Sequence, residues 1–144
     1  MKVAWLAAAA LALAAVSAHR EYVPYHPNGA LIPNRGGGLG HLSPGGGGKR
    51  NPYGSAWEEA GKDAAAWSAK DWALCKADSD GDGQSNGFEL GDVCCNWTVA
   101  SGVAPATKTS ISNPGDAKST SSRPHVNCTA AAPAAPFTRL RGAA

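Results

Sequence analysis

The sequence is short of charge and of long apolar runs. Of its 144 residues, 17% are Asp, Glu, Lys or Arg, and basic and acidic side chains nearly cancel. It therefore lacks the basic surface that binds nucleic acid or an anionic membrane. No apolar run reaches the roughly 20 residues that a membrane-spanning helix needs. The catalytic patterns HExxH, HxH and GxSxG are also missing, so we expect no enzyme.

The first residues have the features of a secretory signal peptide. A lysine follows Met1, residues 3–16 are almost wholly apolar, and Ser17 and Ala18 supply a small-residue cleavage site. We therefore predict a signal peptide over 1–18, a secreted extracellular protein and a mature chain of net charge +1. Two Asn-x-Ser/Thr triplets fit that compartment and predict a glycoprotein modified at Asn96 and Asn127.

The four cysteines predict disulfide bonds, because an even number in a secreted chain is normally oxidised. They are Cys75, Cys94, Cys95 and Cys128. A bond between the adjacent Cys94 and Cys95 would force a strained ring. Cys75 is therefore expected to pair with one of these two and Cys128 with the other. Zinc is the alternative, but there is no CxxC pair to hold it.

Composition divides the mature chain into three parts. Residues 19–50 form a Gly/Pro-rich leader, which we expect to pack on the core because it carries scattered apolar residues. Residues 51–115 hold four of the five tryptophans and form the core, whereas 116–144 are rich in Ala, Ser, Thr and Pro and predict a disordered tail. The expected core residues are Trp57, Trp67, Leu74, Leu90 and Trp97.

The pattern predicts two or three short helices in a small, mostly irregular, disulfide-stapled domain. Ser55 and Glu58 have the spacing of a capping box, and Gly61 would end the helix they open. Ser68 is expected to begin a second helix that runs to about Lys76. The alanines at 64–66 favour helix and could fuse the two.

Residues 78–89 follow the pattern of an EF-hand-like calcium loop, D-x-D-x-D-G-x5-E. The predicted calcium ligands are Asp78, Asp80, Asp82, the backbone carbonyl of Gln84, Asn86 and Glu89. The alternative is a bare acidic turn, in which four carboxylates within twelve residues would repel one another. There is no second loop to pair with, and Gly91 limits the exit helix to about one turn. We therefore expect a structural site of extracellular affinity rather than a calcium sensor.

Several stretches together resemble the temptin family. They are Gly40-His41, KRNPYG at 49–54, Leu74-Cys75, DSDGDGQSNG at 78–87 and ELGDVCCNW at 89–97, with Pro-Asn-Gly at 27–29 and Asn-Pro-Gly at 113–115 as outer markers. The resemblance covers roughly residues 27–115. It implies a secreted, pheromone-like protein with a paired-cysteine core in which Cys75 bonds to one of the adjacent cysteines. The family often has a leader cysteine that is missing here, and Cys128 lies outside the matched stretch.

Three functions remain open from the sequence. The first is a calcium-stabilised, non-catalytic module, a monomer that binds an extracellular protein or glycan or acts as a signal. The second is a matrix or cell-wall structural protein, suggested by the tail. The third is a small copper enzyme, in which His19 would become the N-terminal residue and His26 or His41 would supply a third nitrogen.

Overall fold

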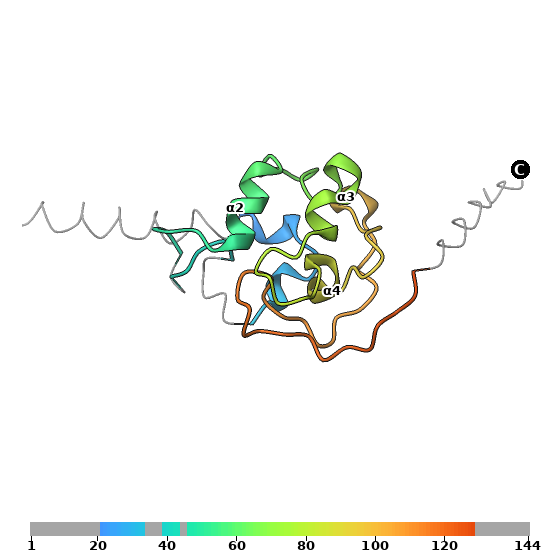
Figure 1. Ribbon diagram of the computed structural model, residues 1–144. Helices are drawn as coiled ribbons and strands as arrows, with labels where there is room; N and C mark the ends of the chain where they lie inside the picture. Colours follow the sequence, from blue (N-terminus) through green and yellow to red (C-terminus); the bar gives the residue numbers. More distant parts are fainter. Residues whose placement is uncertain (1–20, 34–38, 44–45, 129–144) are drawn as a thin grey trace, which may run out of the picture.

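Short helices joined by long irregular segments make up the fold (Figure 1). The computed structural model describes residues 21–33, 39–43 and 46–128; the predicted signal peptide and His19 lie outside them. The helical elements are η1 (Val23–Tyr25), η2 (Gly29–Leu31), α2 (Pro52–Glu59), α3 (Ala69–Lys76), α4 (Asn86–Leu90) and η3 (Val99–Ser101). Within the described ranges there is no strand, and His41 and Arg50 form an isolated antiparallel bridge. No helix in these ranges is long and apolar enough to cross a membrane. The small, mostly irregular, helical fold is confirmed.

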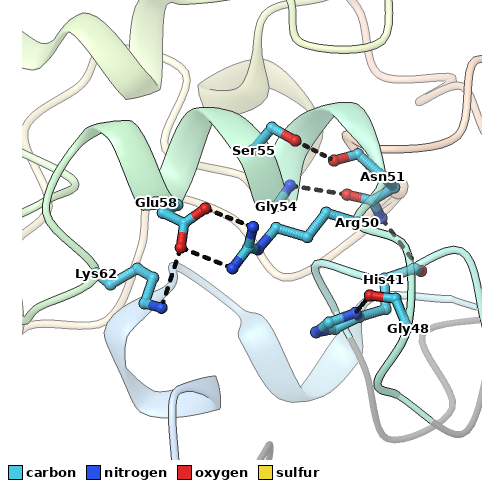
Figure 2. Close-up of polar contacts among 8 residues, drawn as sticks. All are labelled: His41, Gly48, Arg50, Asn51, Gly54, Ser55, Glu58 and Lys62. Carbon is cyan, nitrogen blue, oxygen red and sulfur yellow. Dashed lines mark hydrogen bonds and ion pairs between the residues drawn. The ribbon is translucent and has the colours of Figure 1, made fainter.

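Helix α2 begins earlier than the capping-box pattern predicted. Asn51, not Ser55, is the N-cap, because its side-chain oxygen accepts a hydrogen bond from the Gly54 N–H at 2.8 Å (Figure 2). Pro52 follows at the first helical position, where its fixed φ and missing N–H suit the helix. The predicted N-cap at Ser55 is wrong because the helix already begins at the Asn51-Pro52 pair, which lies upstream of the Ser-x-x-Glu pattern. Gly61 follows the helix with a φ of +114°, a conformation that suits glycine and stops the helix as expected.

Helix α3 lies where the sequence placed it, but it is separate from α2. Residues 64–66 form a turn instead of fusing the helices, and the Asp63 carboxylate accepts a hydrogen bond from the Ala65 N–H within it. Ser68 precedes α3 without making a side-chain cap bond. Residues 70–72 at the start of α3 have left-handed dihedrals, so only its later part continues as a right-handed turn.

The core is centred on the predicted tryptophans. Trp57, Trp67, Leu74 and Leu90 are buried as expected, whereas Trp97 is only half-buried and packs against the core from outside. The Trp67 indole N–H donates to the buried carboxylate of Asp92 at 2.8 Å. That bond fixes the ring in the interior, because an indole N–H needs a partner when it is buried.

Leader residues contribute more to this core than their glycine content suggested. Ile32 and Leu39 are buried in it, and the buried His26 and the half-buried Tyr22 pack edge-on against Trp57. In Figure 1 the blue leader segment runs through the centre of the view, between α2 and α4. The aromatic and branched residues between the glycines therefore form part of the domain.

Both disulfides form, and the structure decides between the two pairings left open. Cys75 bonds to Cys95, and Cys94 bonds to Cys128. The first bond joins the end of α3 to the segment that follows α4, so it closes the predicted calcium loop from its flanks. The second bond holds the chain at residue 128 against the domain.

A strap formed by residues 109–125 runs beneath α4 (Figure 1, orange to red). Arg123 in this strap donates hydrogen bonds to the backbone oxygens of Phe88 and Thr109. Its guanidinium also lies over the Phe88 ring, 5.3 Å from the centroid. The predicted disordered tail is therefore wrong between residues 116 and 128, because these contacts and the Cys94–Cys128 bond hold that segment; residues 129–144 lie outside the described ranges.

Candidate functional site

The acidic loop brings three of the predicted ligands together. Carboxylate oxygens of Asp78, Asp80 and Asp82 all lie within 4.8 Å of one another. The backbone supports this cluster, because the Asp78 carboxylate accepts hydrogen bonds from the N–H groups of Gly81 and Gly83, each at 2.8 Å. Both glycines have positive φ, so the chain can turn sharply around the carboxylates.

Three carboxylate oxygens at this site are buried without a hydrogen-bond partner in the described chain. They are Asp80 Oδ2, Asp82 Oδ2 and Glu89 Oε2. Glu89 is fully buried, and its other oxygen accepts a hydrogen bond from the Ser112 hydroxyl at 2.8 Å. A buried charged oxygen left unpaired destabilises a fold considerably, so each of these needs an explanation.

The electrostatics show that the acids share one region. Burial raises the pKa of Glu89 to about 8, and the charges of Asp80, Asp82 and Asp78 act in the same direction against the opposing hydrogen bond from Ser112. Burial and the Asp82 charge likewise raise the pKa of Asp80. The loop thus has more negative charge than its own backbone N–H groups compensate, and it is suited to a cation with oxygen ligands.

Comparison with known proteins gives the chain a family. The family described as Temptin C-terminal matches residues 16–116. The protein named Temptin from Aplysia californica is 40% identical over 114 residues, which cover 75% of this chain and 85% of that protein. The chain belongs to the temptin family. No solved structure matches it.

The family match over residues 16–116 contains the whole acidic loop and Ser112, but it ends before Ser121 and Arg123, which also contact the loop from the strap. The amide of Gln84 pairs with the backbone of Ser121, donating to its carbonyl at 2.9 Å and accepting from its N–H at 2.7 Å. The Gln84 side chain therefore ties the loop to the strap, and its backbone carbonyl stays a predicted ligand.

Asn86 holds the loop closed. Its amide nitrogen donates to the Leu74 carbonyl at 2.7 Å and to the Ser79 hydroxyl at 2.8 Å, and its oxygen accepts from the Ser79 N–H. Asn86 is fully buried. The side chain predicted as a ligand thus joins the end of α3 to the start of the loop.

Sequence reasoning missed Ser112, Ser121 and Arg123, which act on the loop and α4 from the strap. They lie in a Ser/Thr/Pro-rich stretch where no apolar period or motif singles them out. The Asn-Pro-Gly at 113–115 gave the nearest signal, since it ends the resemblance to the temptin family beside Ser112. Only the folded chain shows that these residues bond to the loop.

The other predicted sites are separated from this loop. Asn96 and Asn127, the predicted glycosylation sites, are exposed, as glycosylation would require. His26 is buried with its Nδ1 2.7 Å from the Tyr53 hydroxyl, and the His41 ring lies 3.3 Å from the Gly48 carbonyl oxygen. Both histidines take part in packing or hydrogen bonds of the leader.

Proposed function

We propose that the chain is a secreted, calcium-stabilised and non-catalytic module that binds or signals outside the cell, as the resemblance to temptin suggests. Two disulfides support an oxidising, extracellular compartment, because such bonds rarely persist in a reducing one. Membership of the temptin family and the predicted signal peptide support the same compartment. A pheromone-like role rests on the resemblance alone.

The observation that carries the calcium proposal is the group of three buried, unpaired carboxylate oxygens. Asp80, Asp82 and Glu89 each supply one, and Asp78 lies beside them. All are hard oxygen donors, which calcium prefers and which zinc or copper sites usually replace with nitrogen or sulfur. A bound calcium ion would supply positive charge and no chemical step. The residues around the ion would keep their hydrogen bonds, such as the one that the Ser112 hydroxyl donates to the Glu89 carboxylate.

Thermal unfolding with and without calcium tests this proposal. A metal that binds only the folded state stabilises it by about 2.7 kcal/mol at 100 times its Kd, so millimolar calcium should raise Tm by several degrees. Asp80→Asn removes one half-buried carboxylate, with its buried Oδ2, from the site and should abolish most of that rise. Asp71→Asn is the matched control, because Asp71 is an exposed acid outside the loop.

An equal rise in Tm for the wild type and Asp80→Asn would contradict the proposal, as would no rise in the wild type. Magnesium provides a second control. It demands a near-ideal octahedral site and releases its water reluctantly, so it should stabilise the protein less than calcium does. Equal stabilisation by the two metals would indicate screening of acidic charge and not a calcium site.

A further inference from the structure

A cavity lies between the leader and α2, and it shares no residue with the acidic loop. Its volume is about 260 Å³. Tyr22, His26, Tyr53 and Trp57 form one wall, and Arg50 and Lys62 stand at its edge. This is below the roughly 300–1,000 Å³ of pockets for drug-sized ligands, so its volume suits a single small ring.

Four aromatic rings give the cavity an apolar and rigid wall. The centroid of the Trp57 ring lies 4.9 Å from that of Tyr22 and 4.8 Å from that of His26, and His26 lies 5.5 Å from Tyr53. All three pairs are edge-to-face, which is a preferred arrangement of aromatic rings. The wall is therefore fixed before any ligand arrives, and its accessible π surface comes mainly from the half-buried Tyr22, because the other three rings are at most 8% exposed.

Two nitrogens in this wall lack a partner in the described chain. The Trp57 Nε1–H is buried and makes no hydrogen bond. His26 uses Nδ1 for the Tyr53 hydroxyl, and no bond is formed by its Nε2 among the described residues. Burial lowers the pKa of His26 to about 3, so the ring stays neutral at physiological pH. The wall therefore carries no charge, and the Trp57 Nε1–H, which has almost no accessible surface, can report on binding without facing the ligand.

The edge of the cavity carries balanced charge, and Figure 2 shows the ion pairs that Arg50 and Lys62 form with Glu58. Arg50 forms a fork with Glu58 through contacts of 2.5 and 2.6 Å, and Lys62 reaches the same carboxylate at 3.3 Å. Glu58 stands behind these two cations, and Glu21 is the acid that lines the cavity itself. Because two cations and two carboxylates balance, this edge favours neither an anionic nor a cationic ligand. It does place several hydrogen-bond donors and acceptors side by side.

We propose that this cavity binds a neutral, polyhydroxylated ring, the chemistry of a sugar residue. A sugar ring has an apolar C–H face that packs on aromatic rings, and its hydroxyls both donate and accept hydrogen bonds. The aromatic wall matches the first property and the Arg50–Glu58–Lys62 edge matches the second. The inference holds whether or not the acidic loop binds calcium, because the two sites are made of different residues.

NMR titration of the full chain with methyl glycosides of glucose, galactose, mannose and N-acetylglucosamine tests the proposal. At least one glycoside should shift the indole Nε1–H resonance of Trp57 with a millimolar Kd, which is typical of one small ring. Arg50→Ala should weaken that binding about tenfold or more, because it removes the fork at the edge. Lys76→Ala is the matched control, since Lys76 is another exposed, ion-paired cation that lies outside the cavity.

Further arms of the experiment separate the sources and the competing ligand classes. If the protein binds immobilised oligosaccharides but no free glycoside, the bound ring belongs to the end of a larger glycan. Stronger binding of benzoate or tetramethylammonium than of every carbohydrate would overturn the proposal. Failure of all glycosides and oligosaccharides to shift Trp57, or equal binding by Arg50→Ala and the wild type, would overturn it too. Calcium-dependent stability is measured separately, so failure here leaves the calcium result unaffected.

Discussion

Protonation of His26 should destabilise the protein in mild acid. The side chain is 4% exposed, packs edge-on against Trp57 and faces the Tyr53 hydroxyl at 2.7 Å. Burial lowers its pKa from 6.5 to about 3 and raises that of Tyr53, so both groups are neutral in the folded protein. In mild acid His26 therefore stays uncharged as long as the protein is folded, and it takes up a proton when the chain unfolds.

The sign and size of the effect follow from proton linkage. Below pH 6.5 the unfolded chain takes up a proton on His26, whereas the folded protein does not do so until about pH 3. The free energy of unfolding therefore falls as the pH is lowered, by up to about 1.4 kcal/mol per pH unit. Between about pH 7 and pH 5 the loss is about 2 kcal/mol, and it levels off as the pH nears the folded-state pKa.

Urea unfolding of the wild type and of His26→Asn, each at a series of pH values in calcium buffer, isolates this contribution. Asparagine places a hydrogen-bonding group near the position of Nδ1 and does not titrate. The difference in unfolding free energy between the two proteins should shift by about 2 kcal/mol between about pH 7 and pH 5, because other titrating groups are common to both. A pH-independent difference would refute the reasoning. NMR titration of wild-type His26 is a check that needs no variant: titration near its ordinary pKa would refute it equally.

Three further variants, one of them a double substitution, test the packing. Gly54→Ala should destabilise the protein by about 1–3 kcal/mol, measured by Tm, because the new Cβ would lie 2.0 Å from the Gly40 carbonyl oxygen. Replacing both Cys94 and Cys128 by serine should lower the free energy of unfolding by about 2–4 kcal/mol in urea titrations. Asp92→Asn should cost about 1–3 kcal/mol, because the buried carboxylate accepts an indole and two backbone N–H groups that a single amide oxygen cannot serve equally. Unchanged stability in any of these variants would contradict the corresponding contact.

The features predicted well from the sequence are those with local chemistry. The alternating aspartates predict a loop that brings their carboxylates together. In the structure, carboxylate oxygens of Asp78, Asp80 and Asp82 lie within 4.8 Å of one another. Gly91 stops α4 because it adopts φ +81°, which glycine tolerates. A bond between the adjacent Cys94 and Cys95 would force a strained ring, so each was expected to reach a distant partner, and each does. In each case a few neighbouring residues determine the outcome.

The features that were missed depend on contacts between distant segments. The strap is held by hydroxyl and backbone groups such as those of Ser112 and Ser121, whose composition alone resembles that of a disordered tail. The cavity needs the leader's Tyr22 and His26 beside α2, and glycine-rich segments carry no periodicity that would predict such packing. Even the N-cap at Asn51 depends on the leader, because its amide also donates to the Leu39 carbonyl.

The surroundings of the acidic loop favour a brace over a switch. A calcium sensor transmits binding by letting its exit helix swing away from the entering helix. Here the Cys75–Cys95 bond ties α3 to the chain just beyond α4. A side chain at Gly91, at the end of α4, would lie 2.4 Å from the Thr107 carbonyl oxygen, so that end is packed in place. Calcium bound in this loop should therefore raise the stability of the domain and leave its shape unchanged.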